Sequence, residues 1–211
     1  EGEIVFLDNV GYWGMNIQKG HHYHLSFYAK TQDNFDIRPH FTKQGAPPSA
    51  PYPLTYIKAD KRGWTQYSYD VEAQEDVPNA QLRLDITPTF RTSNISRVLT
   101  FSLDMVSLFP TNTWKSRPNG LRYDLANKLN ALKPAFIRFP GGCFVEGFNL
   151  KEAFRWKKTI GDLKTRPSHG NKNWDYHSTD GLGYHEYLQM CEDMKAEPLF
   201  VINCGMACAF R

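Results

Sequence analysis

The fold of the second half of the chain is decided by one stretch, Ala135-Phe136-Ile137-Arg138-Phe139-Pro140-Gly141-Gly142. A short apolar run that ends in proline and two glycines is typical of a buried β-strand followed by a loop. The segment before it, residues 121–132, repeats leucine at helical spacing, and Pro134 ends that pattern. A helix followed by a continuous apolar strand indicates one unit of a parallel α/β sheet.

A second unit of the same kind follows later in the chain. Residues 184–195 predict a helix with its apolar positions on one side, and residues 199–203 predict another apolar strand. A loop-rich, polar stretch covers residues 147–180 between the two units. Two such units do not close a (β/α)8 TIM barrel, which takes about 250 residues. The second half is therefore expected to be part of such a barrel.

The first half follows a different period. Apolar and polar residues alternate over residues 22–30, 64–71, 80–86 and 99–108, as half-buried strands require. Glycine and proline separate these runs, and no stretch keeps a 3.6-residue apolar period. Several short strands at this spacing predict an antiparallel β-sandwich of the jelly-roll-like kind. The predicted domains are 1–112, the sandwich, and 113–211, the partial barrel.

Composition excludes several classes of protein. The 211 residues include 25 Lys plus Arg and 22 Asp plus Glu, which is usual for a globular protein. Basic residues are scattered rather than grouped, so we expect no nucleic-acid partner. No apolar run is long enough to span a membrane. The first residues lack the basic and apolar regions of a signal peptide, so we expect none here. All four cysteines follow residue 142, which argues against a disulfide-stapled domain.

Two loops follow the predicted parallel strands, where the chemistry of parallel barrels is found. The first is 141–147 and the second is 203–207. Gly141 and Gly142 would let the backbone approach a ligand closely, and Cys143 and Asn203 could each supply a polar contact. The alternatives stay open: the glycine pair also suits a plain tight turn, and Cys143 also suits a small buried position.

These residues resemble a known family. Residues 138–147, Arg-Phe-Pro-Gly-Gly-Cys-Phe-Val-Glu-Gly, are similar to the second-strand motif of the family 51 glycoside hydrolases, the α-L-arabinofuranosidases. The resemblance continues on both sides, through residues 107–122, 155–167 and 174–186. Residues 11–14 and 19–30 resemble the carbohydrate-binding-module-like sandwich that some members carry before the second barrel strand.

The resemblance implies an enzyme that releases terminal non-reducing α-L-arabinofuranosyl groups from arabinose-containing polysaccharides or oligosaccharides, with no cofactor. Its retaining mechanism uses two glutamates about 5–5.5 Å apart. In the family both lie on later barrel strands, whereas this chain covers about strands 2–3. We therefore expect no catalytic residue here and no turnover by this chain alone. Gly141, Gly142, Cys143 and Asn203 are expected to form part of the substrate-binding floor.

Several features of the sequence allow other interpretations. Glu146 lies in the first loop, but the family pattern gives it no catalytic role, and pairing with a nearby basic side chain is the plainer interpretation. No metal site is expected, since the Cys204–Cys208 spacing and the scattered histidines fit no zinc pattern. A non-catalytic carbohydrate-binding protein or a structural remnant without a ligand would also explain the chain. An extracytoplasmic location is expected for a polymer-degrading enzyme.

Overall fold

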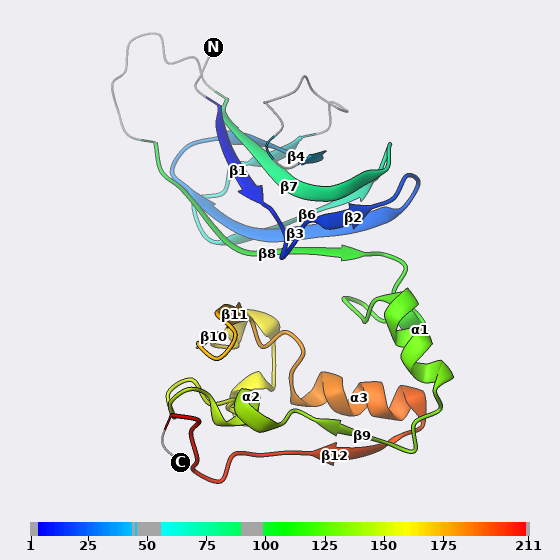
Figure 1. Cartoon of the computed structure of the whole chain (residues 1–211). Helices are drawn as coiled ribbons and strands as arrows, with labels where there is room; N and C mark the ends of the chain where they lie inside the picture. The colour runs from blue at the N-terminus through cyan, green and yellow to red at the C-terminus, as the bar shows by residue number, and fades with distance from the viewer. Residues whose placement is uncertain (1–3, 44, 46–55, 90–98, 210–211) are drawn as a thin grey trace. The chain divides into compact units, whose positions relative to one another are not determined.

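The computed structural model describes residues 4–43, 45, 56–89 and 99–209. The chain divides into two compact units, Glu1–Arg122 and Tyr123–Arg211. Strands dominate the first unit, and helices and short strands share the second (Figure 1). Most regular structure in the described residues is sheet.

The first unit is built from two antiparallel sheets. One has the strand order β1-β7-β4-β5, with β2 also pairing with β7, and the other has the order β6-β3-β8. The strands are β1 (Val5–Asn9), β2 (Met15–Ile17), β3 (His22–Thr31), β4 (Phe35–Lys43), β5 (Ile57–Ala59), β6 (Thr65–Glu72), β7 (Val77–Pro88) and β8 (Phe101–Pro110).

The two sheets share one apolar core. Alternate residues of β3, including Leu25 and Phe27, are fully buried, and their partners in the core come from β4, β5 and β7. Phe35 of β4 meets Phe101 of β8 edge to face, with ring centroids 5.2 Å apart. Because these contacts join strands of different sheets, the apolar faces of the two sheets close on each other.

The predicted strands at 22–30, 64–71, 80–86 and 99–108 are confirmed as β3, β6, β7 and β8. The pattern did not predict β1 or β4. In β4, Pro39 interrupts the expected strand composition. Proline lacks the backbone N–H, but β5 pairs with Phe35–Ile37, so among the described strands Pro39 has a paired neighbour only on the β7 side.

Residues 113–122 belong to the first unit in this division of the chain. The backbone N–H of Thr111 donates to the carbonyl of His22 at 2.9 Å, which holds the end of β8 on β3. Beyond it, Trp114 is buried, and its backbone N–H bonds the carbonyl of Leu121. The compact unit thus ends after residue 122, whereas the sequence pattern places a domain boundary at 112.

In the second unit, two of the three α-helices lie along the chain between the two parallel strands. Its helices are α1 (Tyr123–Ala131), α2 (Gly142–Glu146) and α3 (Tyr184–Met194), and its strands are β9 (Phe136–Phe139), β10 (His169–Asn171), β11 (Tyr176–Ser178) and β12 (Glu197–Phe200). β9 pairs with β12 in parallel, and β10 pairs with β11 as a small antiparallel hairpin. The hairpin and short 3-10 helices lie within the stretch expected to be loop.

The predicted helices at 121–132 and 184–195 are confirmed as α1 and α3. Cys191 and Met194 of α3 are buried, as the apolar side of that helix requires. In contrast, Phe136 of β9 and Leu199 of β12 expose 62% and 53% of their surface. Leu132, just after α1, is also exposed. The two-stranded sheet therefore keeps an uncovered apolar face within the described chain.

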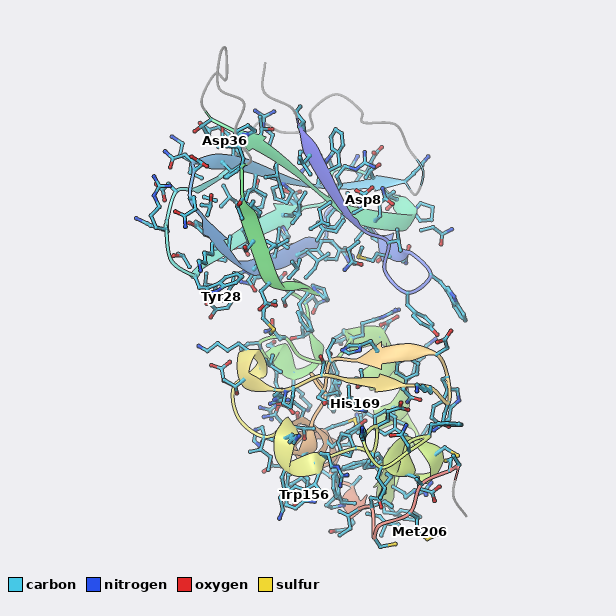
Figure 2. The ribbon with its side chains drawn as sticks, turned by 90° about the vertical axis from the view of Figure 1, so that its left-hand side faces the viewer. Asp8, Tyr28, Asp36, Trp156, His169 and Met206 are labelled. Atoms are coloured by element: carbon cyan, nitrogen blue, oxygen red, sulfur yellow. The ribbon has the colours of Figure 1, made fainter. Side chains whose placement is uncertain are left out.

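One ion pair fixes β1 against β7. Asp8 of β1 (Figure 2) lies directly opposite Arg83 of β7, and its carboxylate accepts two hydrogen bonds from the guanidinium, Nε–Oδ1 at 2.6 Å and Nη2–Oδ2 at 2.8 Å. The Arg83 side chain is only 8% exposed. The hydrogen bonds from Arg83 lower the pKa of Asp8 despite partial burial.

We expect Asp8→Asn to lower the free energy of unfolding of this unit by about 2 kcal/mol at neutral pH, because it leaves a buried guanidinium without its charged partner. A carboxylate with a lowered pKa stabilises the fold above its unfolded pKa, and that contribution is lost as the pH falls through the folded value. The difference between variant and wild type, measured by urea unfolding, should therefore shrink in acid.

The matched control is Asp70→Asn, which removes a carboxylate paired with His24 across β3 and β6 in the same unit. The Asp70 side chain is 73% exposed, so its loss should change stability little. Equal losses from both substitutions would contradict the role given to the Asp8–Arg83 pair.

Candidate functional site

The parallel pairing of β9 with β12 brings two distant loops to one edge. Phe139 and Phe200, the last residues of the two strands, are register partners, and the backbone N–H of Val201 donates to the carbonyl of Phe139 at 2.9 Å. Both strands run the same way, so the loops that follow them leave from the same end of the sheet. The segment 141–147 and the segment 201–208 therefore start side by side.

Aromatic rings of α3 cover the ends of both strands. Tyr187 stacks on Phe139 with ring centroids 4.4 Å apart, and Tyr184 meets Phe200 edge to face at 4.6 Å. Phe139 and Phe200 themselves are 5.6 Å apart. Trp156, labelled in Figure 2, contacts Tyr184 at 4.9 Å. This packing holds the strand ends, and hence the starts of the two loops, in fixed positions.

The start of α3 is fixed by an ion pair between a buried arginine and a partly buried glutamate. The guanidinium of Arg166 donates to both carboxylate oxygens of Glu186, at 2.8 and 3.0 Å, and the backbone N–H of Gly183 donates to Glu186 at 2.9 Å. Burial by itself raises the pKa of Glu186, but Arg166 and the backbone N–H groups outweigh it and lower the pKa. The charged carboxylate therefore caps the helix that covers the strands.

The first loop turns at once into a short helix. Gly141 is extended, and a Cβ there would collide with the guanidinium of Arg138. Gly142 has φ +52°, a backbone conformation that favours glycine, and no atom lies within 4 Å of the place where its Cβ would stand. Gly142 is therefore the first residue of α2, and the direction in which a side chain would point from it is open.

In the second loop, the side chain of Asn203 holds its own segment together. Its Nδ2 donates to the carbonyls of Val145 and Met206 at 3.0 and 2.9 Å. Its Oδ1 accepts from the backbone N–H groups of Gly205 and Met206 at 2.6 and 3.0 Å. Both N–H donors and both lone pairs of the amide are used. Asn203 thus links the loop that carries Met206 (Figure 2) to α2.

Further backbone bonds join the two loops. The N–H of Cys208 donates to the carbonyl of Gly147 at 3.0 Å, and the N–H of Ala209 donates to the carbonyl of Phe148 at 3.1 Å. Gly147 has φ +71°, and a Cβ there would lie 2.6–2.8 Å from backbone atoms of residues 149–153. The glycine is therefore required both by conformation and by space.

Three side chains with ligating atoms meet where the loops join. The sulfur atoms of Cys143 and Cys208 and a carboxylate oxygen of Glu146 all lie within 4.8 Å of one another. The Cys208 thiol donates to Glu146 Oε2 at 3.3 Å. Hydrogen bonding to Cys143, burial and hydrogen bonding to Glu146 raise the pKa of the Cys208 thiol to about 11. Without a bound cation, Cys208 is therefore a protonated thiol at neutral pH.

The structure brings Gly141, Gly142 and Cys143 into one loop and places Asn203 in the neighbouring loop. The spacing of residues gave no sign of Cys208 or Asn173 as neighbours of this site. The side-chain Nδ2 of Asn173 donates to the carbonyl of Cys143 at 3.1 Å. Asn173 lies in the turn between β10 and β11, in the stretch expected to be loop, so only the folded chain reveals it.

No helix among the residues that the structure describes is long and apolar enough to cross a membrane.

We expect Gly147→Ala to destabilise the second unit by about 1–3 kcal/mol, because the alanine would need a strained positive φ and a clash with backbone would remain. Native-state hydrogen exchange should show faster exchange of the Cys208 and Ala209 amides, whose acceptors lie on the displaced segment.

Gly161→Ala is the matched control for this prediction. Gly161 also has a positive φ, but nothing lies within 4 Å of its Cβ position. Gly161→Ala should therefore cost only the free energy of holding an alanine at a positive φ. The Cys208 amide should stay protected from hydrogen exchange. Equal effects of the two substitutions at that amide would contradict the role of Gly147.

The sequence of the chain is similar to those of several known proteins. Residues 128–209 match the α-L-arabinofuranosidase 1 domain. α-L-Arabinofuranosidase 1 of Arabidopsis thaliana is 38% identical over 204 residues, which are 96% of this chain and 28% of that protein. An extracellular exo-α-L-arabinofuranosidase of Streptomyces chartreusis is 34% identical over 94% of this chain and 24% of its own length.

A solved structure of an arabinose-bound GH51 α-L-arabinofuranosidase is also similar. It superposes with a TM-score of 0.80 at 28% identity, over 99% of this chain and 33% of that protein. The chain thus spans between about a quarter and a third of the relatives it matches. In sequence and in backbone, the chain is therefore similar to a segment of the family 51 α-L-arabinofuranosidases.

Proposed function

We propose that this chain forms part of an enzyme that releases terminal non-reducing α-L-arabinofuranosyl groups from arabinose-containing polysaccharides or oligosaccharides by a retaining mechanism. The observation that carries the proposal is similarity over almost the whole chain to α-L-arabinofuranosidases, together with an arabinose-bound structural relative. The relative named extracellular supports an extracytoplasmic location for this protein.

Within that enzyme, we assign residues 1–112 to a carbohydrate-binding-module-like β-sandwich and residues 113–211 to about strands 2–3 of a (β/α)8 barrel. Two facing antiparallel sheets support the first assignment. A parallel strand pair covered by a helix supports the second. The exposed apolar side chains of Phe136 and Leu199 suit a sheet whose further cover comes from additional barrel strands.

The role of this chain would be to form part of the sugar-binding floor. Gly142 faces open space beside the strand ends, where a furanose ring can approach the backbone closely. Gly141 and Cys143 flank it in the same loop. Asn203 contributes by holding the second loop against α2, because the hydrogen-bonding capacity of its amide is already used within the protein. These residues bind and position the sugar rather than react with it.

Retaining hydrolysis needs a nucleophile and an acid/base that face each other across the sugar, about 5–5.5 Å apart. At the edge where the loops meet, the carboxylate in the candidate site is that of Glu146, and the Cys208 thiol donates to it. A single carboxylate cannot perform both roles. The two catalytic glutamates are therefore assigned to later barrel strands of the longer enzyme.

We expect purified residues 1–211 to show no turnover of a nitrophenyl α-L-arabinofuranoside in a chromogenic assay, because neither catalytic glutamate is present. A longer protein containing the later barrel strands should hydrolyse it. Turnover by the chain that disappears in Glu146→Gln would contradict the proposal and give Glu146 the catalytic role.

Binding at the first loop can be tested separately by calorimetric titration with L-arabinose. We expect Gly142→Asn to weaken binding by about tenfold or more, since asparagine tolerates a positive φ but fills the open space above the loop. Gly161→Asn is the control, because Gly161 is equally open and lies outside both loops. Unchanged affinity in folded Gly142→Asn would contradict sugar binding at this loop.

A further inference from the structure

The loop junction holds three potential metal ligands that come from two separate segments. Cys143 and Glu146 are three residues apart on α2, a spacing that puts their side chains on one face. Cys208 comes from the loop after β12, more than sixty positions along the chain. The two sulfur atoms and a carboxylate oxygen lie within 4.8 Å of one another, and Cys208 Sγ is 3.3 Å from Glu146 Oε2.

Contacts outside the cluster hold its three residues in place. The N–H of Cys208 bonds Gly147, the N–H of Gly147 bonds the carbonyl of Cys143 at 2.8 Å, and Asn173 bonds the same carbonyl. Asn203 ties its loop to Val145, which lies between the two α2 ligands. The arrangement therefore does not depend on the thiol–carboxylate hydrogen bond alone, and a cation would meet ligands that are already assembled.

The distances suit a tetrahedral zinc ion. Zinc–sulfur bonds of about 2.3 Å at tetrahedral angles separate two sulfur atoms by about 3.8 Å, and sulfur from a carboxylate oxygen by slightly less. The separations within the cluster reach these values with small side-chain movements. Two thiolates and one carboxylate are also the ligands that select zinc over hard cations such as magnesium and calcium.

We propose that Cys143, Glu146 and Cys208 form a binding site for Zn²⁺, with a fourth position open to water. On binding, the two thiol protons leave to solvent and each sulfur coordinates as a thiolate. The ion would join the loop after β9 to the loop after β12. It would thereby stabilise the edge of the sheet at which the candidate sugar site lies, but the proposal does not depend on sugar binding.

The test is titration of the full chain, purified under reducing conditions, with Zn²⁺ alone and in competition with a chelator. We expect one equivalent to bind and to raise the unfolding temperature with the logarithm of the free zinc concentration once that concentration exceeds the Kd. Co²⁺ in place of zinc should give the intense near-ultraviolet absorption of cobalt–thiolate bonds. Cys143→Ser and Cys208→Ser should each weaken binding by at least about tenfold.

The matched control is Cys204→Ser, which removes an exposed cysteine of the same loop that lies outside the cluster. It should leave zinc affinity and the cobalt spectrum unchanged. Glu146→Gln should weaken binding while it keeps an oxygen that can accept the Cys208 hydrogen bond. If a serine variant fails to fold, the cobalt spectrum of the wild-type chain still decides whether thiolates bind the metal.

Three results would overturn the proposal. They are the absence of zinc binding by the reduced chain, binding that Cys204→Ser abolishes as strongly as Cys208→Ser, and a cobalt spectrum without thiolate absorption. Thiol counting on protein purified under reducing conditions gives a further test. A Cys143–Cys208 disulfide that persists under those conditions would also overturn the proposal, because the two sulfur atoms would then be bonded to each other and not available to a metal.

Discussion

The parallel pairing of β9 with β12 is the constraint on which the candidate site depends. Phe139 and Phe200 are register partners, so the loops that follow them start at the same edge. Tyr184 and Tyr187 of α3 pack on these two rings and hold the strand ends. A slip of the register by one residue would separate the loops and would break the contacts that now bring Cys143 and Cys208 together.

Much of this arrangement could be predicted from the sequence. A continuous apolar run marked β9, helical spacing marked α1 and α3, and alternation marked four strands of the first unit. The strand predicted at 199–203 overlaps only the last two residues of β12 (Glu197–Phe200). Periodicity reports which side of a segment is apolar, and this is a local property of the sequence. It could not report β4, where Pro39 is tolerated because, among the described strands, only β7 pairs with the chain at that residue. Nor could it report contacts between residues far apart in the chain.

The candidate site shows the same limit. Glycines after an apolar strand pointed to the first loop, and the resemblance pointed to Cys143 and Asn203. The structure gives Asn203 a different use, since its amide is filled by four hydrogen bonds that fold its own loop and fasten it to α2. Cysteine spacing along the sequence argued against metal, yet the fold joins Cys143 to Cys208 beside Glu146. Ligand clusters of this kind depend on topology, which spacing does not reveal.

A nitrogen-15 NMR titration of the chain with L-arabinose tests whether sugar binds where the loops after β9 and β12 meet. Binding there should change the chemical shifts of the amides of Gly141–Cys143 and residues 203–208. The exposed rings of Tyr12 and Trp13 lie next to each other in the first unit and would be an alternative platform for a sugar. Changes confined to the amides around those two residues, with none in the two loops, would contradict sugar binding at the loops.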